Sequence, residues 1–187
     1  MSKVLILYGT RYGTTKGISD EIEKVIQEKG IITESYNLKD HSLKEIPLLK
    51  DYNGVIIGTG IKMNMWTKVV KKFFEKRKLE LKNLQNKLGF YVCCGEAAKK
   101  DNINKAINKY ITLKLEKFDI EPVLIDAFGG AYDLTDGSMI KGMTRKIVIS
   151  MMKEEEGIEN PEGELHDFRD WEQIRLFANK FSGFLDK

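Results

Sequence analysis

Residues 4–17 read VLILYGTRYGTTKG, a continuous apolar run followed at once by a loop rich in glycine and threonine. An uninterrupted apolar run of this kind is typical of a parallel strand that is covered on both faces. The residues that follow repeat apolar side chains at helical spacing from Ile18 to Ile26 and end at Gly30, a residue suited to a helix C-terminus. The stretch therefore predicts a strand, a loop and a helix.

The alternation of strand and helix recurs along the rest of the chain. Residues 31–36 also read as a strand, and further apolar segments predict strands at residues 54–58, 88–94 and 122–128, with helices between them. Asp170 is placed to cap a last helix that buries Trp171, Ile174, Phe177, Ala178 and Phe181. The sequence therefore predicts an α/β fold, a doubly wound five-stranded parallel sheet with helices on both faces.

Length, charge and hydropathy restrict the class of protein. The 187 residues, 42% of them hydrophobic, can bury a good core, and we expect one domain over residues 1–187. The net charge of +3 is slight and basic residues alternate with acidic ones, so no nucleic-acid partner is expected. No apolar run approaches the length of a membrane span or a signal-peptide core, which predicts a cytoplasmic protein.

The loop after the first strand has the chemistry of a phosphate site. It precedes a helix N-terminus, where unpaired backbone N–H groups and the helix dipole favour an anion. Gly13 permits close approach of the backbone, and the hydroxyls of Thr10, Thr14 and Thr15 can donate to phosphate oxygens. Neither G-x-G-x-x-G nor G-x-x-x-x-G-K-[ST] is present, so the loop is not a common dinucleotide or nucleoside-triphosphate site.

The pattern Thr10-x-x-Gly13-x-Thr15 directly after VLILY resembles the FMN-phosphate loop of the flavodoxin family. More narrowly, the chain is similar to the flavodoxin-like menaquinone-dependent protoporphyrinogen IX dehydrogenases. The segments that carry this similarity are VIIGTGIKMNMW, DWEQIRLFANKF and a long insertion after the fifth strand, at about residues 130–167. The resemblance covers nearly the whole chain and implies the strand order 2-1-3-4-5.

The resemblance also implies an FMN site built from three loops at the carboxyl ends of the strands. The first loop would hold the phosphate, and the second and third would flank the isoalloxazine ring. The flavin carries the chemistry, so no catalytic side chain is expected. The implied cofactor-binding residues are Thr10, Arg11, Tyr12, Gly13, Thr14, Thr15, Thr59, Gly60, Ile61, Lys62, Met63, Asn64, Met65, Trp66, Cys93, Cys94, Gly95, Glu96, Ala97 and Ala98.

Two residues of the second loop leave alternatives open. Met65 or Trp66 could pack on the ring face, whereas Trp66 could equally fill the core at a helix start. The positive charges of Arg11 and Lys62 would favour an anionic reduced flavin. We therefore expect a reduction potential less negative than that of a strongly acidic flavodoxin.

Cysteine and histidine give no sign of a metal site. Cys93 and Cys94 are adjacent, and since a bridge between neighbours strains the peptide, buried thiols are favoured over a redox pair. His41 and His166 lie in polar surroundings without ligand spacing, so both are expected at the surface.

The insertion contains a segment that reads as a basic amphipathic helix over residues 138–153. Its apolar face would carry Met139, Ile140, Met143, Ile147, Val148 and Met151, opposite four basic residues. Such a helix could cover an apolar substrate, dock a redox partner, touch a membrane surface, or pack on its own domain. The candidate substrate or partner surface is Met139, Met143, Ile147 and Met151.

Two functions follow from these features, and a third is weaker. The first is a flavoenzyme that oxidises an apolar substrate, such as a porphyrin precursor, and passes electrons to a quinone. The second is a flavodoxin-type carrier between protein redox partners, since Lys62 to Met65 departs from the aromatic and histidine-bearing loops of the dehydrogenases. An interaction module without flavin is disfavoured by the intact phosphate loop.

Overall fold

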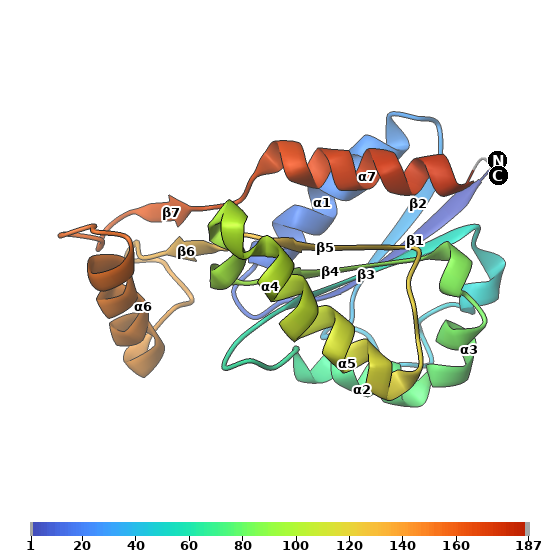
Figure 1. Cartoon of the computed structure of the whole chain (residues 1–187), viewed down its shortest axis with the longest axis horizontal. Helices are drawn as coiled ribbons and strands as arrows, with labels where there is room; N and C mark the ends of the chain where they lie inside the picture. Colours follow the sequence, from blue (N-terminus) through green and yellow to red (C-terminus); the bar gives the residue numbers. More distant parts are fainter. Residues whose placement is uncertain (1, 186–187) are drawn as a thin grey trace.

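A five-stranded parallel sheet forms the centre of the computed structural model, which describes residues 2–185 (Figure 1). The strand order is β2-β1-β3-β4-β5, and every neighbouring pair is parallel. The predicted fold and strand order are therefore confirmed. The strands are β1 (Lys3–Gly9), β2 (Ile32–Asn37), β3 (Gly54–Gly60), β4 (Leu88–Cys93) and β5 (Leu124–Phe128).

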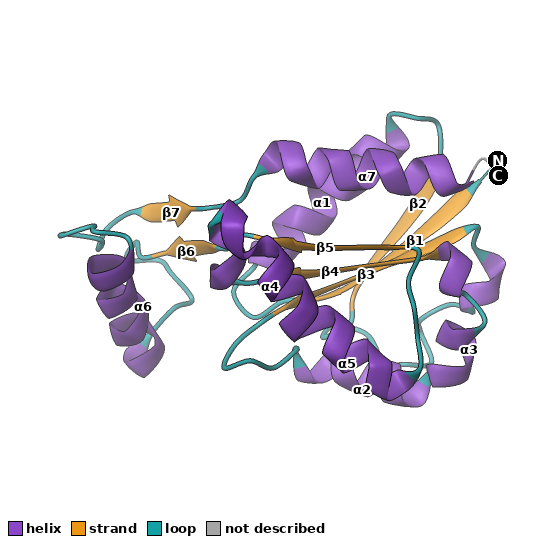
Figure 2. Ribbon diagram, in the orientation of Figure 1, coloured by secondary structure: helices purple, strands orange, loops and turns teal. Residues whose placement is uncertain are grey.

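Helices cover both faces of this sheet (Figure 2). On one face lie α1 (Thr14–Gln27) and α7 (Trp171–Leu185), and Asp170 Oδ1 accepts a hydrogen bond from the Gln173 N–H as the predicted cap of α7. On the other face lie α2 (Lys68–Lys76), α3 (Lys78–Lys82) and one long helix formed by α4 (Ile103–Ile107), η5 (Asn108–Thr112), α5 (Leu113–Leu115) and η6 (Glu116–Phe118). Short 3-10 turns complete the layers, at η1 (Leu49–Asp51), η2 (Gln85–Lys87), η3 (Gly95–Ala98) and η4 (Lys100–Asn102).

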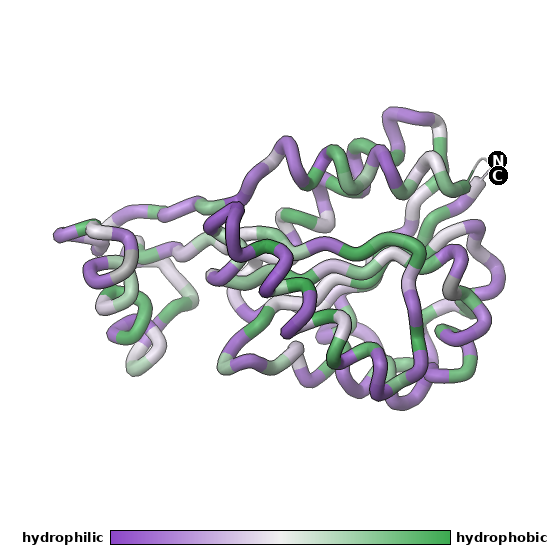
Figure 3. The backbone as a smooth tube through the Cα atoms, in the orientation of Figure 1, coloured by the Kyte–Doolittle hydropathy of each residue, from purple (hydrophilic) through white to green (hydrophobic). Residues whose placement is uncertain are grey.

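Alternate side chains of the central strands fill two separate cores. Figure 3 colours the backbone by hydropathy, and hydrophobic segments lie along the strands of the sheet. Leu5 and Leu7 face the α2 side, whereas Val4 and Ile6 face α1 and α7. All four side chains are fully buried. This two-sided burial explains why the first strand is an unbroken apolar run.

The long helix on the α2 side is not regular. Residues Asn108–Thr112 form a π-helical turn between α4 and α5. A π turn inside an α-helix shifts the backbone by one residue and is frequent near functional sites. Here it directs Tyr110 toward the second loop, as described below. The sequence pattern predicted a helix in this region but gave no sign of the irregular turn.

The insertion extends beyond the carboxyl ends of the strands, at the far side of the molecule from both termini (Figure 1). It contains a short antiparallel pair, β6 (Ala131–Asp133) and β7 (Leu165–Asp167), together with α6 (Gly142–Glu155). The predicted helix began too early, at 138, because the Ser138 hydroxyl accepts the Ile140 N–H in a turn and Gly142 has φ +57°. The β6–β7 pair was not predicted.

The apolar residues of α6 and of the turn before it divide between two surfaces, which corrects the prediction of one apolar face. Ile140, Val148 and Met152 are buried in a third small core with Leu134. Met139, Met143 and Ile147 are exposed by 62%, 73% and 61% respectively. Met151 is partly buried against the third core. Three of the four residues of the candidate partner surface are therefore open to solvent.

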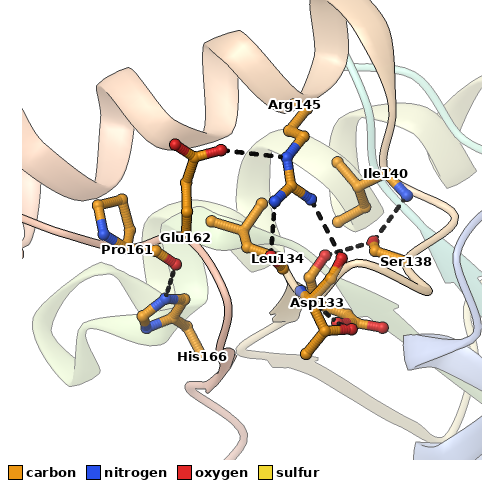
Figure 4. Close-up of polar contacts among 9 residues, drawn as sticks. Asp133, Leu134, Ser138, Ile140, Arg145, Pro161, Glu162 and His166 are labelled. Atoms are coloured by element: carbon orange, nitrogen blue, oxygen red, sulfur yellow. Dashed lines mark hydrogen bonds and ion pairs between the residues drawn. The ribbon is translucent and has the colours of Figure 1, made fainter.

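One predicted surface residue lies inside the insertion. His166 is 9% exposed, and its Nε2 lies 2.7 Å from the Pro161 carbonyl oxygen (Figure 4). The expectation that His166 is a surface residue is therefore wrong. Its polar sequence neighbours concealed the burial, because alternate residues of β7 point to opposite sides. His41 is exposed, as expected.

Candidate functional site

The first loop presents an open helix N-terminus. Gly13 adopts the left-handed conformation with φ +89° immediately before α1, and no side chain caps the helix. The Thr10 hydroxyl oxygen accepts a hydrogen bond from the Gly13 N–H at 3.0 Å, which folds the loop back over the strand end. The first turn of α1 carries no acidic residue. Its backbone N–H groups and the positive end of the helix dipole are thus available to an anion.

The threonines of this loop have different environments. Thr15 is buried, and a Cβ on Gly60 would lie 3.1 Å from the Thr15 hydroxyl oxygen, so the first and second loops are in close contact. The Thr14 hydroxyl donates to the Ala131 carbonyl at 3.0 Å. Thr14 therefore joins the first loop to β6 of the insertion, a contact between residues far apart in the sequence.

Arg11 holds the first two loops together. Its guanidinium donates to the carbonyl oxygens of Gly60 at 2.6 Å and Trp66 at 2.9 Å. Partial burial lowers the pKa of this guanidinium from its usual value, although Arg stays charged at any physiological pH. Arg11 and the second loop are thus neighbours, as predicted, and the positive charge lies between them.

The second loop is a tight hairpin whose tip is apolar. Lys62 and Met65 form an antiparallel bridge around Met63 and Asn64, which both have positive φ, at 50° and 60°. Met63 is 80% exposed and Met65 is 57% exposed. The Asn64 side-chain oxygen accepts the Tyr110 hydroxyl at 2.9 Å. The π-turn residue Tyr110 thereby fixes the tip of the loop.

Trp66 fills the core, which is one of the two alternatives that the sequence left open. Its side chain is 6% exposed and packs against Phe74, Phe90 and Phe118. The indole N–H donates to the Tyr110 carbonyl at 2.7 Å. Because the Trp66 indole is held in the core, Met65 is the one of these two residues whose side chain is exposed beside the loops.

Lys62 connects the second loop with the first loop and with the insertion. Its ammonium donates to the Tyr12 hydroxyl at 2.7 Å and to the Thr144 hydroxyl of α6 at 2.9 Å. The hydrogen bond from Lys62 lowers the pKa of the Tyr12 phenol, because it favours the phenolate. Tyr12 also packs against the third core.

The third loop contains two buried thiols and one ion-paired acid. Cys93 and Cys94 are free and lie in the cores on opposite sides of the sheet. Burial raises their pKa values, to about 12 for Cys93 and about 11 for Cys94, so both are protonated. Burial also opposes ionisation of Glu96, but hydrogen bonds from Lys105 and Lys109 outweigh it and lower the pKa of Glu96. Buried thiols were the favoured sequence interpretation.

The insertion is ordered by its own polar contacts beside these loops (Figure 4). The Arg145 guanidinium donates to the Leu134 carbonyl at 2.6 Å and lies 3.4 Å from the Glu162 carboxylate. The Ser138 hydroxyl donates to the Asp133 carbonyl. A Cβ on Gly95 would lie 2.5 Å from the Tyr132 hydroxyl oxygen, so β6 is in contact with the third loop.

All three predicted loops therefore meet at the carboxyl ends of β1, β3 and β4. The sequence missed Tyr110, Thr144, Ala131 and Tyr132, which join these loops to the long helix and the insertion. None of these residues belongs to a recognisable motif, because each acts through a contact between distant parts of the chain. Within residues 2–185, no group of three or more His, Cys, Asp or Glu side chains could hold a metal ion.

A groove of about 910 Å³ begins at the first two loops and continues between α2 and the long helix. We call it the basic groove. Its cationic lining is Arg11, Lys39, Lys62, Lys68, Lys71, Lys114 and Lys117. The other lining residues are Thr10, Tyr12, Met63, Met65, Trp66, Thr67, Val69 and Phe118. None of the described residues that line it is acidic.

The described part of the chain contains no helix with the length and apolar character needed to span a membrane.

Comparison with known proteins gives one consistent result. Protoporphyrinogen IX dehydrogenase [quinone] of Escherichia coli strain K12 is 27% identical over 190 residues, covering 99% of this chain and 97% of that protein. A flavodoxin from the domain Archaea superposes with a TM-score of 0.56 at 15% identity, covering 99% of each chain. Oxidised Flavodoxin 1 from Bacillus cereus gives 0.55 at 14% identity, covering 97% of this chain and 98% of that one. These two structural similarities, at low sequence identity, show a shared fold. The flavodoxin domain family model matches residues 5–162, so the chain belongs to the flavodoxin-domain family.

Proposed function

We propose that this chain binds FMN at its three loops and acts as an oxidoreductase similar to protoporphyrinogen IX dehydrogenase. The observation that carries the proposal is the open, uncapped N-terminus of α1 behind Gly13, with the second and third loops beside it. When bound, FMN supplies reversible two-electron chemistry between a reduced substrate and an acceptor. In this proposal residues 1–187 form one flavin domain, and residues 130–167 are its substrate-facing insertion.

The first loop fits the phosphate end of FMN. Gly13 has no Cβ to block approach, and the first turn of α1 offers backbone N–H groups without a competing carboxylate. The Thr10 oxygen already accepts the Gly13 N–H, so its own hydroxyl hydrogen is free to donate outward. These residues would bind and neutralise the phosphate.

The second and third loops fit the ring end. Met65 and Met63 are exposed apolar side chains that adapt to a flat apolar surface. Arg11 and Lys62 keep positive charge beside these loops, which would favour an anionic reduced ring. Cys93 and Cys94 would take no part in the chemistry, because both thiols are buried and protonated.

The proposed substrate surface belongs to the insertion. Met139, Met143 and Ile147 present an exposed apolar stripe, and a Cβ on Gly13 would lie 3.9 Å from the Met139 methyl group. The stripe is thus next to the phosphate loop. An apolar substrate or a quinone held there would be close to the flavin loops and shielded from water on one side.

The decisive test is a visible absorption spectrum of the purified protein with added FMN, followed by anaerobic addition of protoporphyrinogen IX and a menaquinone analogue. Porphyrin formation that depends on both FMN and the quinone is the expected result. A flavin spectrum without turnover would contradict the enzyme and leave the electron carrier. Failure to bind FMN at all would contradict both.

The electron carrier is the second candidate because the basic groove opens beside the same loops. A carrier needs a charged face near its cofactor to orient its protein partners. Rapid oxidation of the reduced flavoprotein by a partner protein, with no turnover of small substrates, would favour this function over the first.

A further inference from the structure

The basic groove contains a local excess of positive charge that the net charge of the whole chain does not show. Seven of its fifteen lining residues are cationic, whereas the net charge of the protein is only +3. The cations follow the ends of β1 and β2 or lie in the β3–α2 connection, in α2 and in the long helix, so only the folded chain brings them together. Basic residues elsewhere alternate with acidic ones along the sequence, which conceals this local excess.

Most of these cations have no carboxylate partner. Lys71 lies 3.7 Å from the Glu75 carboxylate. Arg11 and Lys62 donate to neutral carbonyl and hydroxyl oxygens, so they keep their full charge. Among the residues that the structure describes, none supplies an ion pair to Lys39, Lys68, Lys114 or Lys117.

The lysines also act on one another. The pKa of Lys114 is lowered, first by its partial burial and then by the charges of Lys117 and Lys71. Like charges that are held close together in this way raise the free energy of the unbound protein. A ligand that carries several negative charges would relieve the repulsion, which is the arrangement expected of a binding surface.

The floor of the groove is apolar and fixed. The partly exposed side chain of Phe118 is the accessible part of this floor, and it stacks on the buried Trp66 with ring centroids 6.2 Å apart. Val69 at the start of α2 lies beside them in the lining. An occupant therefore needs apolar side chains for the floor as well as carboxylates for the lysines.

We propose that the part of the basic groove outside the flavin loops, lined by Lys39, Lys68, Lys71, Lys114 and Lys117, binds an acidic segment of a protein partner whose apolar side chains contact the floor. A nucleic acid is less suited, since Trp66 is only 6% exposed and no base could stack on it. A membrane surface is less suited too, because the apolar residues of the floor lie within a hollow and cannot insert into lipid. The charge complementarity between the groove and an acidic segment does not depend on FMN binding. Only the role of the partner in electron transfer rests on the proposed function.

The test uses a fluorescein-labelled peptide of about twelve residues, two thirds Glu and one third Leu, with a Lys-for-Glu peptide as its counterpart. Binding is followed by fluorescence anisotropy at about 150 mM salt, where the Debye length of about 8 Å screens remote charges. The test variant is Lys68→Glu with Lys117→Glu. Its matched control, with the same change in net charge, is Lys29→Glu with Lys180→Glu, two exposed lysines outside the groove.

We expect the acidic peptide to bind and the lysine peptide not to bind. The groove variant should weaken binding of the acidic peptide at least about tenfold, whereas the control variant should change it less than about twofold. Equal effects of the two variants would overturn the proposal. It would also be overturned by binding to phosphatidylglycerol vesicles or to oligo(dT) but not to the peptide. Displacement of the peptide by micromolar citrate would overturn it as well, because a small-anion site would then explain the lysines.

FMN binding by the same variants is measured separately from the quenching of FMN fluorescence. Neither Lys68 nor Lys117 lies in the three flavin loops, so both variants should bind FMN as the wild type does. Peptide binding without FMN binding would contradict the proposed function and leave the groove proposal intact. FMN binding without peptide binding would contradict the groove proposal and leave the proposed function intact.

Discussion

Gly13 is the single residue on which the phosphate loop depends. Its φ of +89° is unfavourable for any residue with a Cβ, by about 1–2 kcal/mol, while an added methyl group would meet nothing closer than Met139 at 3.9 Å. We therefore expect Gly13→Ala to lower the melting temperature and to weaken FMN affinity by up to about tenfold, with part of the strain energy appearing in each measurement. Thermal unfolding and FMN titration measure the two parts.

Gly30→Ala is the matched control for that change. Gly30 has φ +75° and open space around it, but it follows α1 at the opposite end from the loop. It should lose stability without any change in FMN affinity. If both variants bind FMN like the wild type, the conformation of Gly13 does not serve the cofactor.

Trp66 gives a second test at the residue scale. Trp66→Phe leaves the Tyr110 carbonyl without its indole donor, so we expect a loss of about 1–3 kcal/mol in unfolding free energy. The flavin spectrum should stay unchanged, because the indole lies in the core. Trp171→Phe, at a partly buried position on the other side of the sheet, serves as the comparison. A shifted flavin spectrum with unchanged stability would place Trp66 at the ring instead.

Individual site residues were predictable only where they form a local pattern. Thr10, Gly13 and Thr15 lie within one loop, so their spacing alone is enough to predict a phosphate site there. Tyr110 is 44 residues from Trp66, and Ala131 is 117 residues from Thr14, so contacts between them depend on the folded chain. For the same reason the sequence could not decide whether Trp66 faces the core or the ring.

At the scale of elements, buried parallel strands were the easiest to predict. The three central strands β1, β3 and β4 are almost entirely buried apolar runs, because helices cover both of their faces, whereas the edge strand β2 reads ITESYN and is only partly buried. The β6–β7 pair has only three residues in each strand and is mostly partly exposed, so it carries no such signal. The apolar periodicity predicted that α6 is a helix. It could not predict which of its apolar side chains are buried within the insertion and which are exposed.

The exposed stripe of the insertion gives the prediction for this scale. Met143→Ser with Ile147→Ser should reduce quinone-dependent turnover by about tenfold or more, because substrate would lose apolar contact area. Stability and FMN affinity should stay within error, since both side chains are already exposed. The measurement is steady-state turnover with varied substrate concentration.

Leu79→Ser with Leu176→Ser provides the control for the stripe. Leu79 and Leu176 are exposed by 78% and 51% and lie on other helices. This pair should leave turnover unchanged. A comparable loss of activity in both double variants would mean that the stripe has no specific role.

For the molecule as a whole, the distribution of charge matters more than its sum. The basic groove, Arg11 and Lys62 surround the proposed flavin loops with positive charge. We expect a reduction potential less negative than that of a strongly acidic flavodoxin, and Lys62→Met should move it to more negative values. Each tenfold change in preference for the reduced state corresponds to about 30 mV for two electrons.

An anaerobic redox titration of the FMN-loaded protein measures this potential. Lys180→Met removes the same charge at an exposed site outside the groove and should leave the potential unchanged. A wild-type potential at or below that of an acidic flavodoxin would contradict the prediction, as would equal shifts in the two variants. The net charge of +3 could not have indicated this effect, because it averages over the whole surface.

The two free thiols at the end of β4 and just after it can report on which face of the fold opens first. Cys93 and Cys94 are buried in cores on opposite sides of the sheet, so we expect an alkylating reagent to reach each thiol only after its own core has loosened. The order in which the two become labelled would therefore report which layer opens first. The protein thus carries, without any added probe, a way to compare how readily each face of the sheet loosens.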